Sequence, residues 1–311
     1  LDKKINLTNH RNLLYLLIRN ELSINYLKNI KFNNNNSSII PSKDLDHNLL
    51  FNLIKFNKLI PFFSNNSLIE YKFPILHQKI KKEAKNELLK SLRLSYLTSD
   101  ISLFLKRNNI KHLIIKGIPL SKKIYNDFSK RGGGDLDVLI DKNQISKTIE
   151  LLKKKEFFCI DNKFPLNSSS VWFKYSKWVY YEITLIRVRN GISEYIDLHW
   201  RINNNSCGLP SFEEIYNFKK DMILNDVNIS IPNLKHNIIL IAVNAAKDKW
   251  LYHRNLIDLE LLIHINGAHF EPSLSQKRFF IMSLYQSSQI IGINSYKSKK
   301  RDKLKLKIAD F

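Results

Sequence analysis

The sequence predicts an α+β protein in which a small mixed sheet with flanking helices lies between an N-terminal and a C-terminal helical region. Three observations lead to this fold class. Apolar residues recur at helical spacing over residues 1–108, short β-branched and aromatic runs occupy 109–232, and helical spacing returns over 233–311. We therefore expect three regions with these boundaries. A chain of 311 residues can bury enough apolar surface to hold them together without disulfides.

The N-terminal region is expected to be mostly helical. Leu13, Leu16 and Leu17 are spaced as on one face of a helix. The longest helical pattern runs over residues 83–106. The asparagine-rich stretch 33–41 is expected to be a loop between two helical stretches.

The middle region is expected to contain short strands and few helices. Strands are predicted at 112–115, 136–140, 157–160, 171–175, 179–187 and 194–200. Helices are predicted over 120–128, where Pro119 suits the first turn, and over 144–155. The three glycines at 132–134 require a flexible or tightly turned backbone.

The C-terminal region returns to helices from residue 234. Apolar residues from Ile238 to Ala245 fall at the i, i+3, i+4 and i+7 positions of a helix. Further helices are predicted over about 255–266 and 274–289. The basic tail at 297–307 is expected to be solvated.

The formal net charge of +22 is compatible with binding to nucleic acid, but the predominance of lysine over arginine weakens that interpretation. Of the 50 basic residues, 11 are arginine and 39 are lysine. Recognition of bases and phosphates relies on arginine forks as well as lysine. The joint excess of lysine, asparagine and isoleucine indicates a compositional bias. Solvated lysine faces are therefore favoured, and a polyanion-binding surface stays open as the alternative.

Cysteine usage and hydropathy bear on the compartment. Cys159 and Cys207 form neither a metal-binding spacing nor a disulfide framework, which fits a reducing environment. No run approaches 18 consecutive apolar residues, so no membrane span is expected. The expected location is the cytoplasm.

The chemistry is expected to centre on carboxylates of two predicted strands. Because side chains alternate along a strand, Asp135 and Asp137 point to one face, while Leu136 and Val138 point to the core. Two carboxylates this close repel each other unless a cation lies between them. Oxygen ligands of this kind suit Mg²⁺.

Asp197 follows the same logic in the strand predicted at 194–200. It shares one face with His199, and three apolar residues share the other face. If this strand lies beside the Asp135 strand, Asp197 completes a two-metal site, in which one ion holds a triphosphate and the other activates an acceptor. We therefore expect Asp135, Asp137 and Asp197 to bind two Mg²⁺ ions, or Mn²⁺ in their place.

The motifs around these aspartates resemble those of a known superfamily. In chain order they are Ile115-Lys116-Gly117, Tyr125, Arg131, Gly134-Asp135-Leu136-Asp137-Val138, Asp197-Leu198-His199-Trp200 and Asp258. The chain thereby resembles the DNA polymerase β-type nucleotidyltransferases and, within them, a group of uncharacterised nucleotidyltransferase family proteins. The resemblance covers about residues 105–265, so 109–232 is expected to be the nucleotidyltransferase core.

Two features depart from the pattern of these relatives. The superfamily's usual Gly-Ser turn is Lys116-Gly117 here, so the turn offers no hydroxyl to a phosphate. Where the group carries His-x-x-x-His-x-Trp, this chain has Asn244, Asp248 and Trp250. The function of those histidines must therefore be absent here or performed differently.

The resemblance implies transfer of a nucleoside monophosphate from an NTP, such as ATP, to a hydroxyl-bearing acceptor with release of pyrophosphate. It implies that Asp135, Asp137 and Asp197 are the catalytic residues. Nucleotide contacts are expected from Lys116, Gly117, Arg131, Gly134 and His199. The acceptor is left open among a small molecule, a peptide and RNA.

Simpler structural roles stay open for several of these residues. Lys116 would then be a surface lysine, Arg131 would hold the glycine turn, and His199 would be a satisfied, partly buried histidine. Lys247 and Asp248 are favoured as part of a solvated helix face. Two other functions also stay open: a nucleic-acid-binding or RNA-modifying protein that uses the basic surface, and an inactive family member that acts as a binding partner.

Overall fold

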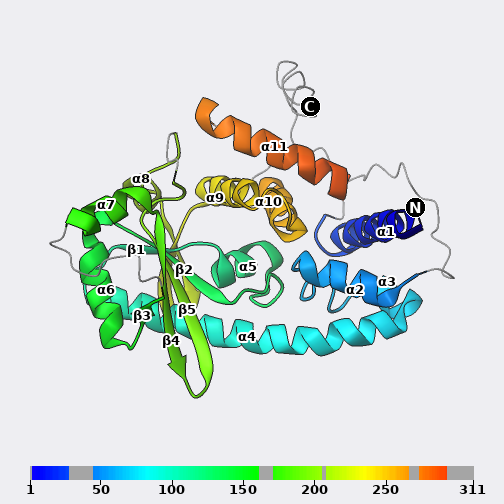
Figure 1. Ribbon diagram of the computed structural model, residues 1–311, viewed down its shortest axis with the longest axis horizontal. Helices are drawn as coiled ribbons and strands as arrows, with labels where there is room; N and C mark the ends of the chain where they lie inside the picture. The colour runs from blue at the N-terminus through cyan, green and yellow to red at the C-terminus, as the bar shows by residue number, and fades with distance from the viewer. Residues whose placement is uncertain (1, 28–44, 161–170, 205–207, 266–272, 293–311) are drawn as a thin grey trace.

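The computed structural model describes residues 2–27, 45–160, 171–204, 208–265 and 273–292. A mixed sheet lies at one end of the molecule, the N-terminal helices lie at the other, and α4 (Pro74–Arg107) runs along both (Figure 1). This arrangement confirms the predicted α+β class with a small mixed sheet and flanking helices. The loop predicted at 33–41, the basic tail and Cys207 lie outside the described residues.

The five-stranded sheet has the order β1-β2-β5-β4-β3. Its strands are β1 (His112–Ile114), β2 (Asp135–Ile140), β3 (Phe158–Cys159), β4 (Glu182–Arg189) and β5 (Ile192–His199). β2 and β5 are parallel neighbours, whereas the other pairs are antiparallel. The two aspartate-bearing strands are therefore neighbours, as the expectation for Asp197 assumed.

Helices cover the sheet and fill the rest of the molecule. Besides α4 they are α1 (Asp2–Asn25), α2 (His47–Phe56), α3 (Ser67–Lys72), α5 (Gly117–Tyr125), α6 (Ile145–Lys154), α7 (Val171–Val179), α8 (Phe212–Asn217), α9 (Leu234–Lys247), α10 (His253–Ile265) and α11 (Leu274–Ile291), with a 3₁₀ turn at Lys142–Gln144. Side-chain caps fix several helix starts: Asp46 caps α2, and Asn233 caps α9 by accepting from the amide of His236.

Residues 171–175, predicted as a strand, form the start of α7, so that prediction is wrong. Aromatic and β-branched residues favour strands, but this preference depends on the surroundings. Here the segment continues as one helix to Val179, and Trp200 Nε1 donates a hydrogen bond of 3.0 Å to the carbonyl of Lys177 near its end. For the same reason β4 begins at Glu182 and not at residue 179.

The hairpin of β6 (Lys220–Leu224) and β7 (Val227–Ile231) is missing from the sequence prediction. Its turn is formed by Asn225 and Asp226, whose φ angles are +47° and +62°. Asn and Asp tolerate this left-handed backbone better than other non-glycine residues. The Asn-Asp pair between two apolar runs is therefore the feature of the sequence that could have predicted this hairpin.

Two large hydrophobic clusters hold these elements together. The first joins α1 and α2 to α9, α10 and α11, so the two terminal helical regions share one core. The second lies between the sheet, α4 and α6, and it includes Trp200, which is 4% exposed. The division of the chain at 108/109 and 232/233 stays a prediction.

Among the described residues, none of the helices has both the length and the apolar character that crossing a membrane requires.

A buried polar network ties the glycine loop to α10. Arg131 Nε donates a hydrogen bond of 2.6 Å to Asp258 Oδ2, and Tyr125 Oη donates one of 2.6 Å to Asp258 Oδ1. Asp258 is fully buried and Arg131 is 4% exposed. A buried ion pair with this geometry fixes the position of the loop that leads into β2, because separating either partner would leave an uncompensated buried charge.

We predict that Asp258→Asn lowers the free energy of unfolding by about 3–5 kcal/mol, because the Arg131 charge loses its buried partner. Urea denaturation followed by circular dichroism measures the change. Glu156→Gln is the matched control, since this exposed carboxylate faces the exposed Arg189 at 3.8 Å in a solvated pair and its loss should cost less than about 1 kcal/mol. Equal effects of the two substitutions would contradict a structural role of Asp258.

Candidate functional site

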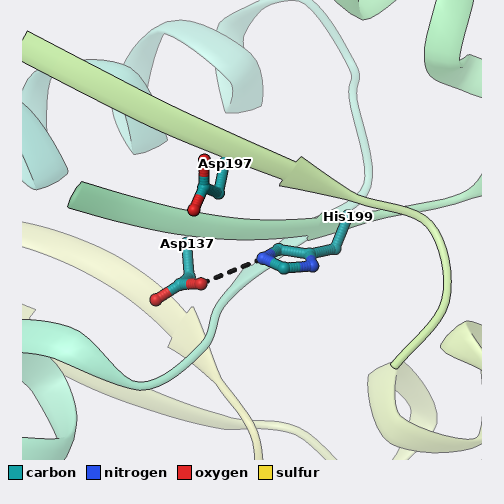
Figure 2. Close-up of side chains that lie close together, drawn as sticks. All are labelled: Asp137, Asp197 and His199. Carbon is teal, nitrogen blue, oxygen red and sulfur yellow. Dashed lines mark hydrogen bonds and ion pairs between the residues drawn. The ribbon is translucent and has the colours of Figure 1, made fainter. Parts of the chain in front are cut away.

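The parallel register of β2 and β5 brings two aspartates side by side. Asp137 lies directly opposite Asp197 in the ladder, and His199 follows two residues later on the same face (Figure 2). One ligand atom from each of these three residues lies within 4.8 Å of the others. The intervening side chains of both strands, such as Leu136 and Leu198, are buried in the second hydrophobic cluster. Strand alternation therefore places the site on the opposite face from this core, as predicted.

His199 is held between two carboxylates. Its Nε2 lies 2.9 Å from Asp137 Oδ1, and its Nδ1 lies 3.0 Å from Glu182 Oε2. Carboxylates only accept hydrogen bonds, so both ring nitrogens are placed as donors. Burial alone would lower the pKa of His199, but the hydrogen bonds to Asp137 and Glu182 outweigh it and raise that pKa. The imidazolium form is thereby favoured, and it supplies positive charge beside Asp137.

Asp137 stays ionised in a buried position. Burial would raise its pKa, but the positive charge of Lys116 and the hydrogen bond from His199 hold the pKa well below its usual range. The Lys116 ammonium lies 3.2 Å from Asp137 Oδ1. Two cations thus compensate one buried carboxylate.

Asp197 differs from Asp137 in its surroundings. It is half-buried, and Thr184 Oγ1 donates a hydrogen bond of 2.6 Å to its Oδ1. Burial raises the pKa of Asp197 above its ordinary value, the Thr184 hydrogen bond opposes this, and the nearby Asp137 charge adds to the rise. Among the described residues, Asp197 has no ion-pair partner. The site therefore has room for additional positive charge on the Asp197 side.

A strained turn carries Lys116 into this site. Lys116 has φ +59° and ψ −145°, a region that is essentially restricted to glycine, and Gly117 follows with φ +52°. This turn separates β1 from the first residue of α5. It directs the Lys116 side chain to Asp137 and brings the N-terminus of α5, with its free amides, next to the strand ends.

Asp135, Gly134 and Arg131 lie further from the Asp137–Asp197 pair. Asp135 is exposed and stands outside the group whose ligand atoms lie within 4.8 Å. Gly134 is exposed beside it, and the described residues place no atom within 4 Å of the position of an added Cβ. Arg131 is buried and already paired with Asp258. The structure thus gives Arg131 the loop-holding contact that was one of its two expected roles.

Glu182 and Thr184 were missed by sequence reasoning. They lie on β4, where Glu182 is paired in register with His199 and Thr184 with Asp197. No motif marks these residues, and their position beside β5 follows from a pairing that the strand pattern alone does not specify. Strand alternation places both side chains on the same face of β4. The sequence therefore indicates that the two residues belong to the site only once the pairing of β4 with β5 is known.

Lys247 also belongs to this environment. Its ammonium lies 3.1 Å from Glu182 Oε1, so a row of alternating charges runs from Lys247 through Glu182 and His199 to Asp137. Sequence reasoning favoured a solvated helix face for Lys247, and its side chain is indeed exposed, while its ammonium also contacts the sheet through Glu182.

The residues present fit a divalent cation. Asp137 and Asp197 supply adjacent carboxylate oxygens, which are the ligands that Mg²⁺ prefers, and Asp135 adds another carboxylate on the same strand face. His199 suits a ligand role less well, because both of its ring nitrogens face carboxylates. We therefore regard His199 as a residue that orients and neutralises Asp137.

The mixed sheet, the aspartates on two adjacent parallel strands and the Lys-Gly turn before α5 agree with the motifs by which the chain resembles nucleotidyltransferases. The family model described as uncharacterised nucleotidyltransferase matches residues 43–277. The chain belongs to this family and is a nucleotidyltransferase enzyme. The match begins well before residue 105, so it includes the helices α2–α4, which carried no recognisable resemblance in the sequence.

More distant likenesses are found among solved structures, and no curated protein matches the chain. One is the antibiotic-resistance factor ANT(2'')-Ia, with a TM-score of 0.42 and 9% identity, covering 64% of this chain and 96% of that one. Another is an antigenic nucleotidyltransferase-like protein from Paracoccidioides brasiliensis, with a TM-score of 0.40 and 12% identity, covering 63% and 87%.

We predict that Lys116→Gly is more stable to urea than Lys116→Met by about 1 kcal/mol. Both variants lose the ion pair with Asp137, but only glycine relieves the backbone strain, which is worth about 1–3 kcal/mol. Glycine also gives the unfolded chain more entropy, which reduces this gain in stability by about 0.5–1 kcal/mol. Comparing the two variants therefore isolates the strain. A Lys116→Gly variant that is less stable than Lys116→Met by about 0.5–1 kcal/mol would show that the turn is unstrained.

Proposed function

We propose that this enzyme moves a nucleoside monophosphate from an NTP to a hydroxyl group of an acceptor and releases pyrophosphate. The observation that carries the proposal is the in-register pair of Asp137 and Asp197 on adjacent parallel strands. Keeping two carboxylates together in a partly buried place is costly unless a cation joins them. The family membership supports nucleotidyl transfer as the chemistry that uses this pair.

Asp137 and Asp197, with Asp135 on the same face, would hold the Mg²⁺ ions, and Mn²⁺ would suit the same oxygens. When bound, such ions neutralise the triphosphate and lower the pKa of a coordinated hydroxyl group. Two ions are proposed because three carboxylates face the site. Asp135 would serve the ion furthest from His199, since Asp135 begins the strand.

Lys116 and the amide of Gly117 would bind the triphosphate. The Lys116 ammonium already lies at the edge of the carboxylate pair, and the N-terminus of α5 offers backbone donors to an anion. Positive charge from His199 would favour the same substrate from the other side of Asp137. Arg131 would contribute by fixing the glycine loop, because its Nε is bonded to Asp258, and only its remaining nitrogens could reach a phosphate.

In the proposed reaction the acceptor oxygen attacks the α-phosphorus, and the bond between the α-phosphorus and the pyrophosphate oxygen breaks. Asp197 would accept the proton of the acceptor hydroxyl. Its hydrogen bond from Thr184 fixes the carboxylate in one orientation, as a proton acceptor in a reacting complex requires. Positioning and charge stabilisation would supply most of the rate, as in other phosphoryl-group transfers.

We predict that Asp137→Asn lowers turnover by about 1,000-fold or more, because several kcal/mol of charge stabilisation is lost. The assay incubates the enzyme with each labelled NTP, Mg²⁺ and an extract of the source cells, and detects labelled product by mass spectrometry. Asp141→Asn is the control: Asp141 follows β2 and caps the 3₁₀ turn, and because asparagine caps a helix about as well as aspartate, both stability and turnover should stay close to wild type. Wild-type turnover by Asp137→Asn would refute the proposed site.

A wild-type chain that binds RNA tightly and turns over no NTP would favour the nucleic-acid-binding alternative.

Gly134 offers a second test, because a side chain there meets nothing in the described structure. Gly134→Ala should keep wild-type stability but reduce transfer at least about 10-fold, since the added methyl group would stand where the nucleotide approaches the backbone. In Gly132→Ala the Cβ would lie 3.3 Å from Glu87 Oε2 at φ +65°, so this variant should instead lose about 1 kcal/mol or more of stability. Full activity of Gly134→Ala would remove Gly134 from the nucleotide site.

A further inference from the structure

A cavity of about 290 Å³ lies beside the glycine loop, between residues of α2, α4 and the start of α10. Asp135 lines this cavity, whereas Asp137, Asp197 and Lys116 do not. In Figure 1 these three helices lie around α5, on the side of the sheet that faces the terminal helices. We propose that this glycine-loop cavity binds an oxyanion, a phosphate or a carboxylate, carried by the acceptor. The inference rests on the proposed function, because it concerns the second substrate of the same site.

The charges on the cavity wall do not cancel. Three cations are neutralised in ion pairs: Lys55 with Glu83 at 2.7 Å, Lys90 with Glu87 at 2.7 Å, and Arg131 with Asp258 at 2.6 Å. Two further cations, Lys58 and Arg254, line the same cavity and form no ion pair within the described part of the chain. Asp135 offsets them in part, but it also faces the carboxylates that would bind metal. The cavity therefore has excess positive charge.

Arg254 gives the strongest indication of a ligand. One guanidinium nitrogen, Nη1, donates a hydrogen bond of 3.1 Å to the carbonyl of Arg131, while Nε is buried and has no hydrogen-bond partner within the described residues. Burial, together with the neighbouring Arg131 charge, lowers the pKa of Arg254 to about 10. Arg254 is half-buried, and Asp258 and Asp135 are near enough to act on its charge, but no carboxylate of the described residues contacts it in an ion pair. An anion in the cavity would supply that contact and the missing hydrogen-bond acceptor.

Lys58 adds a second donor from another element. It follows the end of α2, and its ammonium lies 4.0 Å from the centre of the Tyr252 ring. This cation–π contact holds the ammonium near the start of α10, where Arg254 lies. The two cations come from opposite terminal regions of the chain, so an anion between them would bridge the N-terminal and C-terminal helices.

The direction of the reaction assigns this anion to the acceptor. The attacking oxygen and the leaving pyrophosphate lie on opposite sides of the α-phosphorus. Lys116 and the start of α5, the proposed triphosphate site, contact Asp137. The glycine-loop cavity instead meets the strand at Asp135, two residues earlier. A ligand there would approach from the Asp135 end, with its hydroxyl directed at the carboxylates and its anionic group on Arg254 and Lys58.

Binding of radiolabelled inorganic phosphate, measured by equilibrium dialysis with the full chain, tests the oxyanion site. Wild type should bind one phosphate saturably, and Arg254→Met and Lys58→Met should each weaken binding at least about tenfold, since a charge-assisted hydrogen bond is lost. Lys81→Met is the matched control, because it removes the same charge from an exposed position on α4 outside the cavity. No saturable binding by wild type, or equal binding by all variants, would overturn the proposal. Urea denaturation of each variant checks its folding.

A second arm separates the two sources of the anion. With Mg²⁺ and saturating α,β-methylene NTP analogues, phosphate should still bind if the cavity serves the acceptor. Displacement of phosphate by the analogues would assign the cavity to the triphosphate and overturn the acceptor assignment. Asp137→Asn should keep phosphate binding, since Asp137 does not line the cavity. Failure of the transfer reaction and failure of the oxyanion site would therefore be observed independently.

Discussion

The parallel register of β2 and β5 is the constraint on which the rest of the site depends. It places Asp137 opposite Asp197 and so forces two like charges into close, partly buried positions. Such an arrangement persists only if neighbouring groups compensate it. Lys116 and His199 provide that compensation for Asp137, and each is held in turn: Lys116 by a strained turn, His199 by Glu182. The local features of the site thus follow from one pairing of strands.

Compensation for Asp137 extends outward into the helices. Glu182 holds His199 and also meets Lys247 at the end of α9, so the position of α9 is connected to the orientation of the imidazole ring. On the other side of the site, Asp258 of α10 holds Arg131 and with it the glycine loop before β2. The C-terminal helices therefore help to support the strand that carries Asp137, in addition to covering the hydrophobic core.

The sequence predicted the parts of the fold that depend on local pattern. Alternation along each strand was enough to place Asp135 on one face with Asp137, and Asp197 on one face with His199, because side-chain direction in a strand is a local property. That all three aspartates share one face depended on the assumed adjacency of the two strands. Pairing is not local: Arg131 and Asp258 are separated by 127 positions, and Glu182 meets His199 only because β4 folds back on β5. The strand predicted at 171–175 failed for a related reason, since β propensity depends on neighbours that a single segment does not reveal.

The contacts between α9 and α10 account for Asn244 and Asp248, the two positions at which this chain departs from the His-x-x-x-His-x-Trp pattern of its relatives. Asp248 Oδ2 accepts hydrogen bonds from Asn244 at 3.4 Å and from Asn255 at 3.1 Å, which joins the end of α9 to α10. Trp250 Nε1 donates to Ser283 Oγ at 2.9 Å and extends the junction to α11. These contacts require no histidine. Because Lys247 precedes Asp248 directly, a junction fixed at Asp248 also fixes the ammonium that meets Glu182. In this chain the two positions therefore contribute to the placement of α9 against α10.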